Sequence, residues 1–108
     1  MNKASKYKIV VVLGTAREGR FSERVSKAVL AELGKRKDTE VQFVDVRDHI
    51  FGATINASTS DPRTQSWKEI VVSAGGFFII TPEYNRSYPG ELKMMLDSAF
   101  DEYIRKPA

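Results

Sequence analysis

The apolar residues of this chain form short unbroken runs and longer stretches with helical spacing. Unbroken runs occur in Lys8 to Leu13 (KIVVVL) and in Phe77 to Ile80 (FFII). Runs of this kind are typical of strands that are covered on both faces, as in a parallel sheet. Glu40 to Val46 (EVQFVDV) is predicted as a further strand.

Between these strands, apolar residues recur at the spacing that gives a helix one buried face. The stripe of the first predicted helix consists of Val25, Ala28, Val29 and Leu33. That of the second consists of Trp67, Ile70, Val71 and Ala74. That of the third consists of Leu92, Met95, Leu96, Ala99 and Tyr103, so this helix is expected to reach Tyr103.

The residues at the helix ends agree with these stripes. Ser22 is predicted as the N-cap of the first helix, which ends at Gly34. Asp61 and Pro62 open the second helix as cap and first position, and Pro89 suits the first position of the third. The resulting order β-α-β-α-β-α predicts one α/β domain over residues 1–108, with parallel strands and right-handed crossovers.

The loop that follows the third strand, Thr81 to Ser87, has the chemistry to hold a flat polar ring. Ligands of open α/β sheets bind at the carboxyl ends of strands. Pro82 stiffens this loop, and Tyr84 offers an aromatic face. The alternative is a rigid connector whose Tyr84 and Tyr88 pack on the core, and the residues alone leave both interpretations open.

The loop that follows the first strand, Gly14 to Ser22, favours a phosphate. Thr15 and Ser22 supply hydroxyls, Arg17 and Arg20 supply guanidinium groups, and the helix start adds its dipole. A Walker A motif is excluded because Arg20 and Phe21 replace its Lys and Ser/Thr, and no GxGxxG is present. The alternative is a solvated turn with two surface arginines.

The segment from Thr81 to Lys93, T-P-E-Y-N-x-S-x-P-G-x-L-K, resembles the signature of the NADPH-dependent FMN reductase family. This family belongs to the flavodoxin-like superfamily. The resemblance implies an open parallel sheet in the order 2-1-3 with helices on both faces, so that both loops face one crevice. It also implies an FMN site, formed by Thr15, Arg17, Ser22, Pro82, Glu83, Tyr84, Asn85 and Ser87. The guanidinium of Arg20 adds this residue to the predicted site.

The implied activity is that of an NAD(P)H-dependent oxidoreductase of the flavin or quinone reductase type. Hydride would pass from NADPH or NADH to bound FMN and then, as electrons, to a small-molecule acceptor. Because the cofactor carries this chemistry, no catalytic side chain is expected. The resemblance covers the first part of the usual domain, so the fourth and fifth strands are expected to be lacking. Two alternatives therefore stay open: an FMN-binding electron carrier, and an incomplete domain that binds FMN weakly or not at all and acts through self-association.

The composition of the chain argues against several other functions. With His49 as its one histidine and no cysteine, the chain gives little support for a metal site. A net charge of +3 is too mild for a nucleic-acid surface. No segment approaches the length of a membrane span and no secretory signal is seen, so we expect a cytoplasmic protein.

A homo-oligomer is expected from the third strand. In a 2-1-3 sheet, Phe77 to Ile80 would form an open apolar edge, which is a template for pairing with another chain. The last helix adds apolar residues at Met94, Met95 and Phe100.

Overall fold

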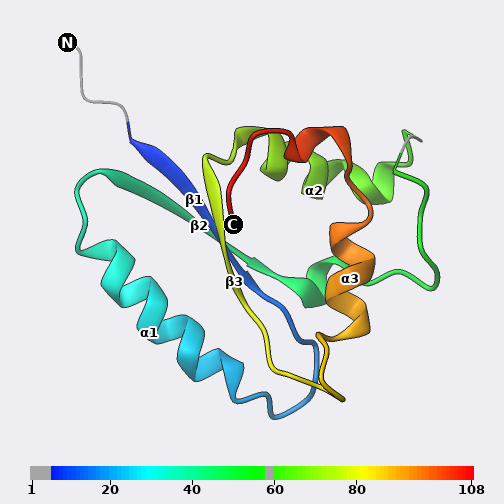
Figure 1. Ribbon diagram of the computed structural model, residues 1–108, viewed down its shortest axis with the longest axis horizontal. Coiled ribbons are helices and arrows are strands. Elements are labelled where there is room, and N and C mark those ends of the chain that lie inside the picture. The colour runs from blue at the N-terminus through cyan, green and yellow to red at the C-terminus, as the bar shows by residue number, and fades with distance from the viewer. Residues whose placement is uncertain (1–5, 58–59) are drawn as a thin grey trace.

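Three parallel strands form one open sheet in the order β2-β1-β3, as predicted. The computed structural model describes residues 6–57 and 60–108. The strands are β1 (Tyr7–Leu13), β2 (Thr39–Asp45) and β3 (Gly76–Ile80) (Figure 1). Leu13 lies opposite both Asp45 and Ile80, so the carboxyl ends of all three strands stand in one row. The two predicted loops therefore start at the same edge of the sheet.

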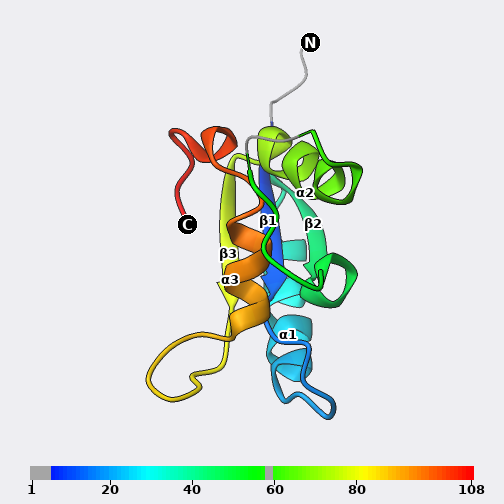
Figure 2. The same cartoon turned by 90° about the vertical axis from the view of Figure 1, so that its right-hand side faces the viewer.

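Helices cover both faces of the sheet. Helix α1 (Ser22–Gly34) lies on one face, and α2 (Pro62–Ser73) and α3 (Gly90–Leu96) lie on the other (Figures 1 and 2). Two short 3₁₀ helices follow β2 and α3, η1 (Val46–His49) and η2 (Asp101–Tyr103). Among the described residues, no helix is long and apolar enough to cross a membrane.

The core lies between the sheet and helices α2 and α3. Val10 and Val12 of β1, Trp67 of α2 and Met95 of α3 are completely buried in it. Trp67 is thus a core residue, as its helical stripe predicted. Met95 also belongs to this core, so it is not available for contacts between subunits.

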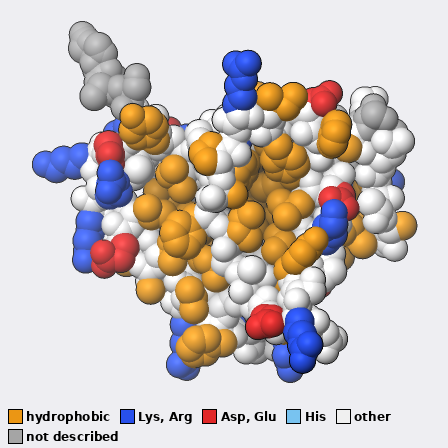
Figure 3. Space-filling model, viewed as in Figure 1, with side chains coloured by type: hydrophobic (Ala, Val, Ile, Leu, Met, Phe, Trp, Pro, Cys, Tyr) orange, Lys and Arg blue, Asp and Glu red, His pale blue; other side chains and the backbone are white. Residues whose placement is uncertain are grey.

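The opposite face is covered less fully, because α1 is the one described helix that packs on it. Phe78 of β3 stays 45% exposed beside Val25, Ala28 and Val29 of α1. Figure 3, which like Figure 1 looks onto the β3 edge of the sheet, shows hydrophobic side chains gathered on that side of the molecule. This incomplete cover leaves apolar surface that could contact another chain.

The third helix is shorter than its apolar stripe predicted. Helix α3 ends at Leu96, and Tyr103 lies in the separate helix η2. The Ser98 hydroxyl donates to the carbonyl of Met95 at 2.6 Å, a local bond that competes with helix continuation. Tyr103 nevertheless packs inward, where its hydroxyl accepts from Trp67 Nε1 and donates to the Leu96 carbonyl. Burial raises the pKa of Tyr103 to about 12, so this bridge stays protonated.

The outer edge of β3 is not wholly open, contrary to the expectation from the sequence. The Phe77 N–H donates to the Pro107 carbonyl at 3.0 Å, and the C-terminal segment lies beside β3 (Figure 1). The edge is therefore covered at its beginning. Among the described residues, no backbone bond is made to the outer side of Ile79.

Candidate functional site

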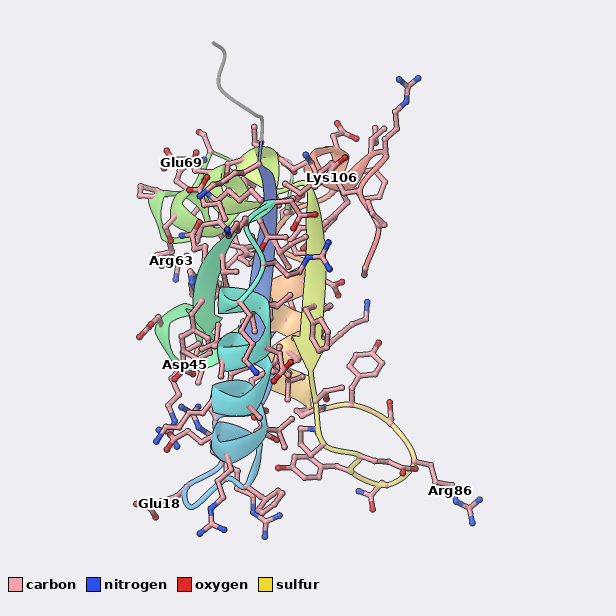
Figure 4. All side chains as sticks on the ribbon, turned by 90° about the vertical axis from the view of Figure 1, so that its left-hand side faces the viewer. Glu18, Asp45, Arg63, Glu69, Arg86 and Lys106 are labelled. Atoms are coloured by element: carbon pink, nitrogen blue, oxygen red, sulfur yellow. The ribbon has the colours of Figure 1, made fainter. Side chains whose placement is uncertain are left out.

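The loops that follow β1 and β3 form the walls of one cleft of about 530 Å3 at the carboxyl edge of the sheet. The first loop is Gly14 to Ser22, after β1, and the second loop is Thr81 to Ser87, after β3. Figure 4 shows both at the same end of the molecule, the first marked by Glu18 and the second by Arg86. Of the nine predicted cofactor residues, six line the cleft: Thr15, Arg17, Arg20, Ser22, Pro82 and Tyr84. The other three, Glu83, Asn85 and Ser87, belong to the second loop but lie outside the cleft walls.

Thr15 and Tyr84 join the two loops directly. The Thr15 hydroxyl lies 3.0 Å from the Tyr84 hydroxyl and also accepts from the Arg17 N–H. The guanidinium of Arg17 lies over the Tyr84 ring, with Cζ 5.8 Å from the ring centroid. In the described part of the chain, this guanidinium has no acidic partner. Arg17 can therefore offer its charge and donors to a ligand in the cleft.

The N-terminal end of helix α1 lies at the same cleft and has no side-chain cap. The predicted cap, Ser22, is instead the first helical residue, because Phe21 occupies the cap position. The Phe21 side chain has no oxygen to accept the N–H groups of the first turn, and no other described side chain accepts them. The Arg24 N–H donates to the Phe21 carbonyl at 2.9 Å, so the N–H groups of Ser22 and Glu23 are the ones available. Together with the helix dipole, they favour an anion at this end.

Arg20 lines the cleft, but its donors are already paired. Nε and Nη2 donate to Glu23, Nη1 and Nη2 donate to Asp45, and Nη1 also donates to the Thr15 carbonyl. These bonds use all five N–H groups of a guanidinium. The hydrogen bonds with Asp45 raise the pKa of Arg20, although burial opposes this shift.

The second loop makes a tight turn. Tyr84 and Ser87 exchange backbone hydrogen bonds of 2.8 and 3.0 Å, and Asn85 and Arg86 between them have φ values of 52° and 64°. Two successive positive φ values define a type I′ turn, which Asn tolerates well and Arg does not. The Arg86 side chain points away from the molecule (Figure 4).

Three residues that sequence reasoning missed hold the first loop. Glu91, in the first turn of α3, accepts the Ala16 N–H at 2.9 Å. Asp45 pairs with Arg20, and Arg47 donates to the carbonyls of Ala16 and Arg17. Two of these residues could have been found from their positions in the sequence. Asp45 and Arg47 stand at the carboxyl end of the strand beside β1, where the 2-1-3 order places them next to the loop.

His49 does not line the cleft. It ends η1 and is buried, with its ring 6.0 Å from that of Trp67 in an edge-on arrangement. Burial lowers the pKa of His49, although Asp48 and Asp45 oppose this shift. The described residues contain no group of three potential metal ligands.

Nearly the whole chain matches a known protein family. The model for the NADPH-dependent FMN reductases matches residues 7–108. The chain belongs to this family. An NAD(P)H-dependent FMN reductase of Schizosaccharomyces pombe is 31% identical over 110 residues, which cover 93% of this chain and 54% of that protein. A 2-hydroxy-1,4-benzoquinone reductase from a Burkholderia species is 37% identical over 92 residues, covering 85% of this chain and 49% of the relative.

Solved structures give the same result for the fold. An apo NADH:FMN oxidoreductase superposes with a TM-score of 0.72 at 26% identity, over 87% of this chain and 50% of the other. A flavoenzyme NAD(P)H:(acceptor) oxidoreductase from Paracoccus denitrificans has a TM-score of 0.66, also at 26% identity, over 84% and 49%. The predicted flavodoxin-like fold is confirmed. The chain spans about half the length of these relatives.

Proposed function

We propose that this chain binds FMN in the cleft between its first and second loops and contributes to an NAD(P)H-dependent flavin or quinone reductase. One observation carries the proposal: the uncapped start of α1, the unpaired guanidinium of Arg17 and the ring of Tyr84 all meet in one cleft. A flavin mononucleotide combines an anionic phosphate with a flat ring, and this cleft has a suitable partner for each.

The phosphate end of the cleft is formed by the first loop. The Arg17 guanidinium would supply charge-assisted hydrogen bonds, and the Ser22 hydroxyl would supply a further donor beside the first two N–H groups of α1. Thr15 is 1% exposed and bonded to Tyr84, so it would hold the two loops together as well as border the phosphate.

The ring end is formed by the second loop. Pro82 and Tyr84 provide apolar and aromatic surface in the cleft. Glu83, Asn85 and Ser87 would act through backbone groups of the same loop, whose turn is fixed by the Tyr84–Ser87 pair.

When bound, FMN would supply the redox chemistry by accepting hydride from a nicotinamide and passing electrons to an acceptor. The chain's own residues bind and orient the cofactor, so no acid or base among them is required. The names of the relatives, which include FMN reductases and a benzoquinone reductase, support a flavin or quinone as the acceptor.

The test is a titration of the purified protein with FMN, followed by flavin absorbance and fluorescence. We expect saturable binding, and then oxidation of NADPH or NADH by the loaded protein. Binding without nicotinamide oxidation would favour the electron-carrier alternative. An absence of binding would overturn the proposal and favour a domain that acts through association.

Two further properties stay predictions. A homo-oligomer is expected from the apolar surface of β3 and α1. A cytoplasmic location is expected from the sequence.

A further inference from the structure

Three successive carbonyl groups of the first loop are held by two arginine side chains. Arg20 Nη1 donates to the Thr15 carbonyl at 2.9 Å. Arg47 donates from Nε to the Ala16 carbonyl at 3.3 Å and from Nη2 to the Arg17 carbonyl at 3.0 Å. The three carbonyl oxygens are therefore occupied by guanidinium donors.

Both arginines are organised by one carboxylate. Asp45 accepts Arg20 Nη1 and Nη2 in a bidentate pair, and its Oδ1 also accepts the backbone N–H of Arg47 at 3.0 Å. The side chains of Arg20 and Asp45 are only 5% and 20% exposed. Asp45 is the last residue of β2, so it fixes both arginines to the sheet. The labelled Asp45 lies at the end of β2 on the side of the first loop (Figure 4).

We propose that Asp45, Arg20 and Arg47 form a brace that holds the first loop in the conformation that accepts a phosphate, with Arg20 as a positioning residue. The functional half of this inference rests on the proposed FMN site. A loop whose carbonyl oxygens faced the phosphate would repel it, and turning them away before binding avoids that cost at the moment of binding. The charge left for the ligand is then that of Arg17, because every donor of Arg20 is used.

The charge state of the pair supports a permanent brace. Burial alone would raise the pKa of Asp45, but hydrogen bonds from Arg20 and the Arg47 N–H outweigh it and hold the pKa below its ordinary value. The carboxylate is thus ionised throughout the neutral range. Without Asp45, Arg20 would keep Glu23 as its acidic partner among the described residues but would lose two hydrogen bonds. Without Arg20, the Asp45 carboxylate would keep only the Arg47 N–H among its described donors, so each single substitution should disturb the loop.

The decisive variant is Asp45→Asn, compared with Asp38→Asn as its matched control. Asp38 also binds an arginine, Arg36, through two hydrogen bonds, but that pair is exposed and lies at the start of β2, away from the loop. We expect Asp45→Asn to weaken FMN binding about tenfold, the size of one hydrogen bond to a charged group. Riboflavin, which lacks the phosphate, should bind as it does to the wild type, and Asp38→Asn should change neither affinity.

A double-mutant cycle separates a brace from a direct phosphate ligand. Arg20→Gln and Asp45→Asn should each weaken FMN binding, and the double variant should be no weaker than either, because both remove one unit. If Arg20 bound the phosphate itself, Asp45→Asn would free its donors and leave FMN affinity unchanged or higher. That result, or an equal loss of FMN and riboflavin affinity, would overturn the inference.

Hydrogen exchange of the flavin-free protein tests the brace independently of the cofactor. The amides of Ala16 and Arg17 are hydrogen-bonded to Glu91 and Thr15, so their protection reports on loop order. We expect both amides to exchange about tenfold faster in Asp45→Asn and at the wild-type rate in Asp38→Asn. If the wild type bound no FMN, the proposed function would fail, while this comparison would still decide the brace. Equal exchange in all three proteins would overturn it.

Discussion

Two arginines of the first loop, three positions apart, have different surroundings. Arg20 is paired with Glu23 and Asp45, whereas the guanidinium of Arg17 lies over the face of Tyr84 and has no acidic partner among the described residues. We predict that Arg17→Ala weakens FMN binding by about 1.5–3 kcal/mol, the range for a hydrogen bond to a charged group. Isothermal titration of both proteins with FMN measures the difference.

Arg24→Ala is a suitable control for Arg17→Ala. Arg24 also lies over an aromatic ring, that of Phe21, with Cζ 5.7 Å from its centroid, but it does not line the cleft. Its loss should leave FMN affinity unchanged. An Arg17→Ala protein that binds FMN like the wild type would remove Arg17 from the phosphate site.

Because His49 is buried, we predict that the protein loses stability in mild acid. Burial holds the pKa of this imidazole below 6.5, so the unfolded chain takes up the proton at a higher pH than the folded one. Above about pH 6.5, His49 should therefore not reduce the free energy of unfolding. As the pH drops from there to the lower pKa of the folded state, the free energy of unfolding should fall. Thermal unfolding followed by the fluorescence of Trp67 at several pH values measures it.

Because the chain has one histidine, the substitution His49→Gln isolates the effect. This variant should lose the part of the pH dependence that lies near pH 6 and keep the dependence at lower pH that comes from carboxylates. An unfolding temperature that varies with pH equally in both proteins would assign the effect to another group.

At the scale of elements, Gly14 sets how closely the first loop approaches α3. A Cβ at this position would lie 2.9 Å from Leu92 Cδ2 and 3.0 Å from the Ile80 carbonyl oxygen. We predict that Gly14→Ala lowers the free energy of unfolding by about 1–3 kcal/mol, the usual cost of overpacking a core. FMN binding should weaken with it, because β1, β3 and α3 meet beside the cleft.

Gly34→Ala gives the matched control for this substitution. Gly34 ends α1, and nothing lies within 4 Å of a Cβ built there. This change should leave stability equal or raise it by up to about 1 kcal/mol, because alanine has the better helix propensity. Chemical denaturation of both variants tests the pair, and equal effects would show that the Gly14 contact can relax.

The elements were predictable where local patterns determine them. The apolar runs of β1 and β3 and the stripes of α1 and α2 required no long-range information. The end of α3 did not follow from its stripe, because Ser98 bonds back to Met95 while Tyr103 reaches the core from a separate turn. The brace could not be predicted either: Asp45 and Arg20 are 25 positions apart, and their pairing depends on how β2 and α1 pack.

At the scale of the whole molecule, the two faces of the sheet differ in cover. Trp67, Met95 and their neighbours close one face. On the other, a shallow groove of about 320 Å3 runs between α1 and β3, lined by Val25, Ala28, Val29, Glu32, Leu33 and Phe78. The lining is almost wholly apolar, and it adjoins the outer edge of β3. Such a surface is a typical association site.

The final prediction is that this chain self-associates through β3 and the adjoining groove. The Pro107 carbonyl accepts the outer N–H of Phe77, but the side chain of Phe78 stays 45% exposed. We expect light scattering at micromolar concentration to give a mass above that of the monomer, and Phe78→Lys to reduce it, because a lysine at a strand edge opposes pairing.

Phe100→Lys is the control, since Phe100 is 75% exposed but lies after α3, away from the groove. A larger effect of Phe100→Lys would move the contact to the end of α3. A monomeric wild type with slow hydrogen exchange from Phe77 to Ile80 would show that the C-terminal segment alone protects this edge, and self-association would be refuted.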